Sequence, residues 1–371
     1  MAGLTRLDAV VWAVLLTCAA AIGAMLALGP RTRPPLSGAG PRAPAGILYL
    51  SPASDIPELW RAPLPGEPGA PEQLTQTGGR VFDYSVAPDG SRIIYSQINN
   101  QSGIDLWLMD SAGGAPQLLV LCGQDRCTGS DWSPDGSRVA YSREEVGAGA
   151  DPRPGPPRIW TVAAGSGQTA PLFQDSQILG HSPSWSPDGQ RLAAFDGNAG
   201  GIRVLDIETG EQQVLDSQLG QVGEWSPDGQ RMLFTAMRLV GEGAFTEVLL
   251  ADFTTRELNP VIGPEAGYVD AGVPAWSPTD DWIVLGVRRR TDSSARGLWL
   301  MRPDASEAAP IASDPGFTNG GYSWDPAGSA VIFQRFPLAT PDALPDVLVW
   351  DMGQQSAEVI AQDAWLARWL P

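Results

Sequence analysis

Short apolar runs alternate with polar turns along this chain from about residue 46 to its end. The clearest runs flank a Ser-Pro-Asp-Gly turn, as in residues 184–195 (SWSPDGQRLAAF) and 224–234 (EWSPDGQRMLF). In such a turn proline presets the second position, aspartate tolerates the third, and glycine accepts a positive φ. Apolar runs on both sides of a tight turn predict two paired β-strands.

The turn belongs to a repeat. Its proline recurs at intervals of 40 to 53 residues, at Pro88, Pro134, Pro187, Pro227, Pro278 and Pro326, and a truncated copy ends at Pro371. A third apolar run follows in each repeat, as in DLWLMD (105–110), and then a fourth, as in PQLLV (116–120). Four short strands in about 40 to 50 residues are typical of one β-propeller blade, so we predict seven blades.

One repeat is divided between the two ends of the chain. Residues 363–371 would supply its first strand and residues 46–77 the other three. Pairing these segments closes the ring and removes exposed sheet edges. The sequence therefore predicts an all-β fold over residues 46–371, a seven-bladed β-propeller closed by pairing of the N- and C-terminal segments.

A tryptophan stands two residues before most of the motif prolines. The series is Trp132, Trp185, Trp225, Trp276, Trp324 and Trp369, and Val86 interrupts it. These residues could stack on a ligand, but bulky packing between adjacent blades is the simpler interpretation.

The pattern WSPDGxRxxY/F followed by xLWxMD resembles the WD-like repeat of TolB-type β-propellers. The resemblance covers roughly residues 46–371 and implies the propeller fold. It says little about function, since such propellers serve as binding scaffolds, as accessory domains of peptidases and occasionally as enzymes. Two copies depart from the pattern, with SPTDD at 277–281 and DPAGS at 325–329.

The first 45 residues differ from the repeats. Residues 1–8 form a short flank, residues 9–29 carry no charge and are long enough to span a bilayer, and residues 30–45 are a Pro/Gly-rich linker. We expect an uncleaved N-terminal transmembrane helix, with a cleaved signal peptide as the alternative. The expected protein is therefore anchored in the membrane by a single span.

Two observations disagree on the side that the propeller faces. Arg31, Arg33 and Arg42 follow the span and would place the propeller in the cytoplasm by the positive-inside rule. Cys122 and Cys127 lie close together between two blades, and a disulfide there would suit an oxidising compartment, although two free thiols remain the alternative. The TolB-type resemblance also favours the exterior, so we expect an extracytoplasmic propeller.

The net charge of the chain limits the classes of molecule that it can bind. The net charge of −18 argues against nucleic acid, whose phosphates require a basic surface. The only basic run is Arg288, Arg289 and Arg290, in the gap between the second and third strands of the sixth repeat. A solvated loop is the simple interpretation, and docking of an anionic partner is the alternative.

The sequence contains few of the residue patterns that catalytic sites use. His181 is the one histidine, so there is no His-rich metal site, and no GxSxG elbow of an α/β-hydrolase is present. Propeller lyases resemble this repeat type but use several histidines around a metal. We therefore expect no enzyme, no cofactor and no metal.

The register of the repeats predicts two rings of residues around the central channel. Three residues before the prolines stand Ser85, Asp131, Ser184, Glu224, Ala275, Ser323 and Arg368. Six residues before them stand Phe82, Thr128, His181, Gln221, Gly272, Gly320 and Trp365. The simplest interpretation is that Asp131 or Glu224 forms an ion pair with Arg368, or that these residues line the channel and face solvent. The alternative is that they hold a small polar ligand or a metal ion on the axis.

Two functions stay open on this evidence. The first is a membrane-anchored, non-catalytic scaffold that binds a protein or peptide partner on the face with the long loops between second and third strands, where we place His181, Phe82, Trp365 and the Cys122–Cys127 loop. The second is a glycan- or small-molecule-binding module, or a lyase-like enzyme, that uses the channel mouth.

Overall fold

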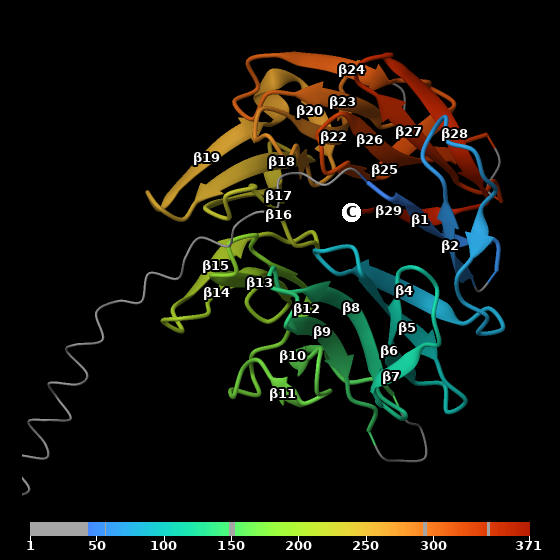
Figure 1. The fold of residues 1–371 in the computed structure, drawn as a ribbon. Coiled ribbons are helices and arrows are strands. Elements are labelled where there is room, and N and C mark those ends of the chain that lie inside the picture. Colours follow the sequence, from blue (N-terminus) through green and yellow to red (C-terminus); the bar gives the residue numbers. More distant parts are fainter. Residues whose placement is uncertain (1–43, 56, 148–152, 292–294, 340–341) are drawn as a thin grey trace, which may run out of the picture. The chain divides into compact units, whose positions relative to one another are not determined.

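Antiparallel β-strands make up nearly all the regular structure of the protein (Figure 1). The computed structural model describes residues 44–55, 57–147, 153–291, 295–339 and 342–371. The described strands belong to one unit of the chain, residues 42–371. The one helix among the described residues is a three-residue 3-10 turn, η1 (Pro264–Ala266).

Each sheet gathers neighbouring segments of the chain. The sheet that joins both ends has the order β29 (Trp365–Leu370), β1 (Gly46–Ser51), β2 (Glu58–Ala62), β3 (Glu72–Gln73). The largest sheet contains β4 (Val81–Val86), β5 (Arg92–Ile98), β6 (Ile104–Asp110), β7 (Gln117–Val120), β8 (Arg126–Trp132), β9 (Arg138–Glu144), β10 (Arg158–Ala163) and β11 (Thr169–Pro171).

Four further sheets follow in chain order. The first contains β12 (His181–Trp185), β13 (Arg191–Asp196), β14 (Gly201–Asp206) and β15 (Gln212–Asp216). The second contains β16 (Glu224–Trp225), β17 (Arg231–Val240), β18 (Gly243–Asp252) and β19 (Glu257–Ile262). The third contains β20 (Tyr268–Ala271), β21 (Ala275–Trp276), β22 (Ile283–Arg289), β23 (Gly297–Met301) and β24 (Ala308–Ala312). The fourth contains β25 (Phe317–Trp324), β26 (Ala330–Pro337), β27 (Asp346–Asp351) and β28 (Ser356–Gln362).

The number of separate blades differs from our prediction. The described residues form five sheets of four or five strands and one sheet of eight strands, in place of seven separate blades. A single parallel pair, Ile104 with Arg126, joins β6 to β8 in the large sheet. The prediction of seven was wrong because the repeat motif reports the turn inside each unit and carries no information about pairing between successive units.

The two ends of the chain pair with each other. Strand β29 lies antiparallel to β1, with Ile47 opposite Trp369 and Leu48 opposite Arg368. The backbone N–H of Ala45 also donates to the carbonyl of Leu370 at 2.7 Å. Because Ile47 and Leu48 are fully buried, β29 covers an apolar edge that would otherwise face solvent.

Hydrogen bonds within the motif turn explain its sequence. In the copy at Pro187, Ser186 Oγ donates to Asp188 Oδ1 at 2.6 Å and accepts the N–H of Arg191 at 2.8 Å. Gly189 adopts a φ of 70°, which a side chain would disfavour. The divergent copy at Pro278 has Asp280 at a φ of 63°, a residue type that tolerates this conformation.

Apolar clusters fill the space between adjacent sheets. One cluster joins Ile47 and Trp369 of the terminal sheet to Ile332 and Val349 of the β25–β28 sheet. Figure 1 shows the sheets following one another around a centre, and the first strands of neighbouring sheets contact each other, as β21 contacts β25 and β25 contacts β29. This arrangement places at least one strand of each sheet near the centre, and the eight-stranded sheet contributes both β4 and β8, which contact each other.

The tryptophan series packs between sheets. All six indoles are buried, and four donate their Nε1–H to the preceding sheet: Trp225 to Ser184 O (3.2 Å), Trp276 to Glu224 O (3.3 Å), Trp324 to Ala275 O (3.1 Å) and Trp369 to Ser323 O (3.2 Å). A tryptophan that fills space and also bonds the neighbouring strand fixes the spacing of adjacent blades. The packing interpretation therefore accounts for these residues.

The expected membrane span receives no support. Residues 9–29 lie outside the described part of the chain, as do nearly all of the flank and linker. Within the described residues, no helix has the length and apolar character needed to cross a bilayer. The prediction of a single-pass membrane protein with an N-terminal transmembrane helix is corrected on this finding.

Candidate functional site

A shared irregularity shapes the strands nearest the channel. Gly129, Ser182, Gly321 and Leu366 all have a positive φ, and each stands five residues before its motif proline. The pairing register shifts around each of these positions. Such bulges change the direction of neighbouring side chains.

Two carboxylates and one guanidinium come together near the axis. Asp131, Glu224 and Arg368 lie on β8, β16 and β29, and they act on one another electrostatically. Asp131 Oδ2 accepts the backbone N–H of Trp185 at 2.7 Å, which ties it to the next sheet. The structure therefore brings together three of the residues that the register predicted to share a ring.

The surrounding protein makes these carboxyl groups weak acids. Desolvation raises the pKa of Glu224 to about 7, while Arg368 lowers it and Asp131 raises it. Desolvation likewise raises the pKa of Asp131 to about 6, against the lowering effect of the Trp185 hydrogen bond and of Arg368. Glu224 nonetheless faces the water-accessible space of the channel, so it can meet a ligand.

A third carboxyl group, Asp83, lies close by and was not among the predicted residues. Its oxygens accept hydrogen bonds from Ser96 Oγ and from the N–H of Gly129 (2.7 Å). Burial raises the pKa of Asp83, although these bonds and Arg368 oppose the rise. Because both oxygens are occupied by the protein, Asp83 is better suited to holding β4 against β8 than to binding a ligand.

His181 stands at the start of β12, beside Ser182. Its Nδ1 lies 3.0 Å from Ser182 Oγ, and its ring packs against Phe195 with centroids 5.2 Å apart. Burial lowers the pKa of His181, and Glu144 partly offsets this effect. The positive φ of Ser182 recurs at equivalent positions of other sheets, so the fold explains the geometry without a nucleophile elbow.

Phe82 lies near the start of β4 and Trp365 at the start of β29, and the two side chains make different contacts. Phe82 is 41% exposed, and the guanidinium of Arg126 lies 5.8 Å from its ring centre. Trp365 packs against the cluster of Leu48 and Tyr84 and has a buried Nε1 without a hydrogen-bond partner. These contacts are those of packing residues at the sheet ends.

The basic run is partly structured. Arg288 and Arg289 belong to β22, so only Arg290 follows the strand as predicted. The guanidinium of Arg289 lies 3.7 Å from the ring centre of Trp299, and that of Arg290 lies 5.8 Å from the ring of Phe245. Aromatic rings thus hold two of the three cations against the protein.

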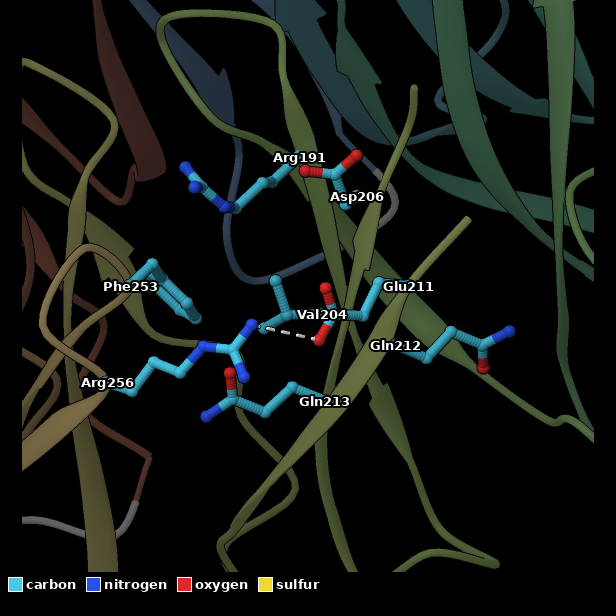
Figure 2. Close-up of a pocket in the computed structure, with 8 residues that line it drawn as sticks. All are labelled: Arg191, Val204, Asp206, Glu211, Gln212, Gln213, Phe253 and Arg256. Atoms are coloured by element: carbon cyan, nitrogen blue, oxygen red, sulfur yellow. Dashed lines mark hydrogen bonds and ion pairs between the residues drawn. The ribbon is translucent and has the colours of Figure 1, made fainter. Parts of the chain in front are cut away.

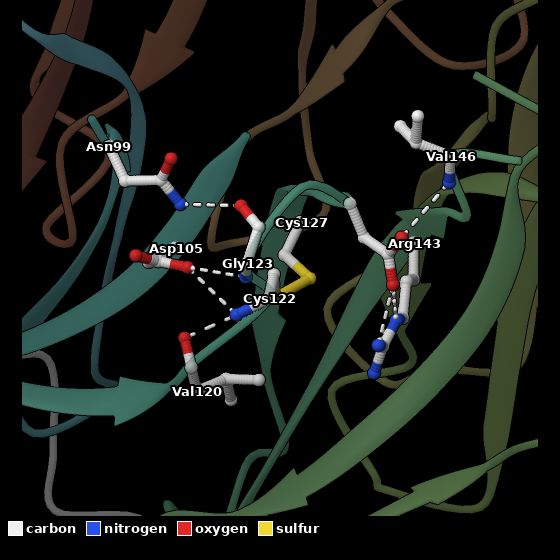
Figure 3. Close-up of a disulfide and its surroundings, with 9 residues drawn as sticks. Asn99, Asp105, Val120, Cys122, Gly123, Cys127, Arg143 and Val146 are labelled. Atoms are coloured by element: carbon white, nitrogen blue, oxygen red, sulfur yellow. Dashed lines mark hydrogen bonds and ion pairs between the residues drawn. A yellow bond between two sulfur atoms is a disulfide. The ribbon is translucent and has the colours of Figure 1, made fainter. Parts of the chain in front are cut away.

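Cys122 and Cys127 form a disulfide that shapes the connection between β7 and β8 (Figure 3). Asp105 Oδ1 accepts the backbone N–H groups of Cys122 at 2.7 Å and Gly123 at 3.2 Å. Asn99 Nδ2 donates to the carbonyl of Gly123 at 2.7 Å. The loop is therefore fastened to β6 as well as closed on itself.

Among the hollows formed by the described residues, two are considered as ligand sites. The first is an open groove of about 410 Å³ beside β14 and β15, where Arg256 and Glu211 form an ion pair at 3.3 Å beside Phe253 (Figure 2). The second is a cavity of about 480 Å³ at the channel, with Glu224, Arg296, Asn319 and Tyr322 in its lining. The second one contains a residue that the sequence analysis placed on the axis.

Polar side chains around the second cavity hold one another in place. Arg296 donates from Nε to Asp270 Oδ2 at 2.6 Å and from Nη2 to Asp270 Oδ1 at 2.9 Å. Tyr322 OH donates to the carbonyl of Val273 at 2.8 Å. Desolvation raises the pKa of Tyr322 to about 12, so it stays a neutral donor.

Sequence reasoning missed Asp270, Arg296, Asn319 and Tyr322. They come from β20, the residue before β23, and β25, and no common spacing connects them. The one available signal was the segment 318–322 (TNGGY), which breaks the apolar pattern just before a motif turn. Among the described residues, no group of three or more His, Cys, Asp or Glu side chains is placed to hold a metal ion.

The fold of this chain is similar to that of known β-propellers. No family model matches the chain. The crystal structure of TolB from Acinetobacter baumannii superposes with a TM-score of 0.50 at 14% identity, over 88% of this chain and 82% of that one. The chain has the fold of a TolB-like β-propeller.

Peptidases are also among the proteins similar to this chain. YuxL of Bacillus subtilis, described as an uncharacterized peptidase, is 24% identical over 222 residues, 58% of this chain and 31% of YuxL. A puromycin-hydrolyzing peptidase of Mycobacterium tuberculosis has a TM-score of 0.61 at 16% identity, over 88% of this chain and 55% of that one. The chain thus spans about a third of the matched YuxL and about half of the mycobacterial enzyme.

These likenesses contradict two of our predictions. We predicted a membrane-anchored, non-catalytic scaffold, with a glycan- or small-molecule-binding module or a lyase-like enzyme as the alternative, and no enzyme as the main expectation. Peptidases are instead among the similar proteins in both the sequence and the structure comparison. The error arose because we required catalytic groups within this sequence, whereas a propeller can serve an enzyme without supplying the nucleophile.

Proposed function

We propose that this chain takes part in peptide hydrolysis, as the substrate-handling propeller of a peptidase. The observation that carries the proposal is the likeness to the puromycin-hydrolyzing peptidase over 88% of this chain and 55% of that enzyme. The match therefore covers this propeller nearly whole and one part of the enzyme. The match to YuxL, in sequence alone, supports the same assignment.

The channel has chemistry that suits a peptide. Glu224 and Asp131 offer negative charge to an ammonium group, and Arg368 offers a guanidinium to a carboxylate. Both signs of charge occur in a free peptide, at its two ends.

Activity that copurifies with the chain tests the proposal. The full chain carrying an affinity tag is purified at native abundance from the cells that make it, and hydrolysis of fluorogenic peptides and labelling by a fluorophosphonate are measured. We expect hydrolysis, with the label on a polypeptide of the purified sample. Labelling of this chain itself would place the nucleophile within it, and labelling of a second polypeptide would make this chain the propeller subunit.

A matched control separates copurified activity from contamination. The tagged chain without residues 363–371 is purified in the same way, because loss of β29 removes the terminal sheet pairing. Peptidase activity that is equal in both samples, or absent from the full-length one, would overturn the proposal.

A further inference from the structure

The cavity beside Glu224 contains a buried acceptor without a partner. Asn319 is 4% exposed and lines the cavity, and its Oδ1 forms no hydrogen bond within the described residues. The amide orientation is fixed, because Nδ2 donates to the carbonyl of Arg296 at 3.0 Å. A flipped amide would set two oxygens against each other, so the unpaired atom is the oxygen.

A buried carbonyl oxygen without a partner is stabilised when a hydrogen-bond donor reaches it. Leaving such a group unsatisfied costs free energy of desolvation, which a ligand with an N–H can recover. The neighbouring guanidinium of Arg296 is held by two hydrogen bonds to Asp270, and it makes none to Asn319 Oδ1. The described side chains therefore leave this oxygen open to a donor from outside.

The charge around the cavity favours a cationic donor. Arg296 and Asp270 neutralise each other as a bidentate pair. Glu224 is the remaining carboxylate of the lining, and no hydrogen bond to its side chain is formed by the described residues. A primary ammonium carries three donors and no acceptor, which matches the two acceptors that Glu224 and Asn319 contribute to this lining.

Glycines keep the cavity open. A Cβ at Gly272 would lie 2.7 Å from Tyr322 OH, and one at Gly286 would lie 3.0 Å from Asn319 O. These positions leave backbone, rather than side chains, along the wall. The volume of about 480 Å³ is within the range of small-ligand pockets and exceeds what a lone ammonium needs, so room remains for the residues behind it.

We propose that this cavity binds the free amino terminus of a peptide, with Glu224 and Asn319 Oδ1 as the acceptors. The inference rests on the proposed function for its choice of a peptide as the source of the ammonium. A peptide would enter amino end first, because its carboxylate would face Glu224 and be repelled. The site thus sets the direction in which the propeller holds its substrate.

Binding to the purified full chain, measured by calorimetry at pH 7.5, tests the inference. The probes are trialanine amide, its N-acetyl derivative and n-butylamine. We expect trialanine amide to bind, and acetylation to weaken binding at least about tenfold because it removes the charge and two donors. Equal binding of both peptides would overturn the inference, and n-butylamine binding as tightly as the peptide would overturn the assignment to a peptide.

Two variants locate the site. Glu224→Gln should weaken binding of trialanine amide about tenfold, and Gly320→Val should block the cavity, since the nearest atom to a Cβ there is 3.9 Å away and space for a larger side chain exists. Glu257→Gln, an exposed carboxylate of β19, is the control and should bind as the wild type does. Unchanged affinity in both site variants would overturn the inference.

Different results would overturn the proposed function and the proposed amino-terminus site. Binding that depends on a free amino group needs no hydrolysis, so it can be found even when the purified sample lacks peptidase activity. Conversely, peptidase activity with equal use of free and acetylated peptides would leave the proposed function standing and remove the amino-terminus site.

Discussion

At the scale of the residue, the same side-chain type does different work in different repeats. The tryptophans share a position in the motif, yet four of them donate to the preceding sheet while Trp132 and Trp185 have buried Nε1 atoms without a hydrogen-bond partner. The residues three positions before the proline differ more, and only Asp131, Glu224 and Arg368 are charged. The repeat therefore determines the position of a residue in the blade, whereas its side-chain type and its neighbours determine which interactions it makes.

A pair of tryptophan variants measures the hydrogen bond alone. Trp276 and Trp132 are similarly buried, and each has an arginine guanidinium 5.0 Å from its ring centre. Trp276→Phe loses the bond to Glu224 O, whereas Trp132→Phe loses none. We expect Trp276→Phe to lower the free energy of unfolding by about 1 kcal/mol more than Trp132→Phe, as measured by urea denaturation. An equal or larger loss for Trp132→Phe would contradict this account.

The pKa of Glu224 makes stability depend on pH. Desolvation raises that pKa from its ordinary value of 4.5 to about 7. Between these values the folded protein holds more protons than the unfolded chain, so the contribution of Glu224 to the free energy of unfolding falls as pH rises through this window. We expect wild type to lose more stability between pH 5 and pH 8 than Glu224→Gln does, in denaturation curves at both pH values. Parallel pH profiles would show that the pKa of Glu224 is not raised.

At the scale of the element, hydrogen bonds and one disulfide shape the connections. The loop between β7 and β8 is held by Asp105, Asn99 and the Cys122–Cys127 bond, and β8 then begins with its parallel pairing to β6. This connection makes one eight-stranded sheet where the repeats predict two blades. The departure from the expected architecture therefore lies at one short loop.

The disulfide should contribute to stability. It closes a loop with a sequence separation of five residues, for which loop-closure entropy predicts about 2 kcal/mol. We expect the double variant Cys122→Ala, Cys127→Ala to unfold at a lower urea concentration than the oxidised wild type. Adding reductant should shift the wild type toward the variant and leave the variant unchanged. A wild type that does not respond to reductant, with both thiols shown free by mass spectrometry, would contradict the bond.

At the scale of the whole molecule, repeat spacing predicted much of the fold and little of the site. The strands, the motif turns and the pairing of residues 46–51 with residues 365–370 follow from the periodic pattern, since each copy repeats one local structure. The cavity could not be predicted, because Asn319 and Arg296 meet Glu224 only through contacts between sheets. Likewise, no motif marks the pairing of Ile104 with Arg126.

Removal of the last strand tests how the molecule is closed. Deletion of residues 363–371 removes β29 and exposes β1, whose Ile47 and Leu48 are fully buried. We expect the shortened protein to lose its cooperative thermal transition and to aggregate, because an apolar sheet edge becomes open. Addition of a synthetic peptide of residues 363–371 should restore part of the stability. An unchanged unfolding midpoint without the peptide would contradict the role of β29.

The central claim is that this propeller handles peptide substrates in the cavity beside Glu224. An experimental structure of the full chain with saturating trialanine amide tests it most directly. The account predicts the peptide in that cavity, with its amino nitrogen within about 3 Å of a Glu224 carboxylate oxygen and of Asn319 Oδ1. A peptide bound instead in the groove beside Arg256 and Glu211, or with its carboxyl end toward Glu224, would contradict it.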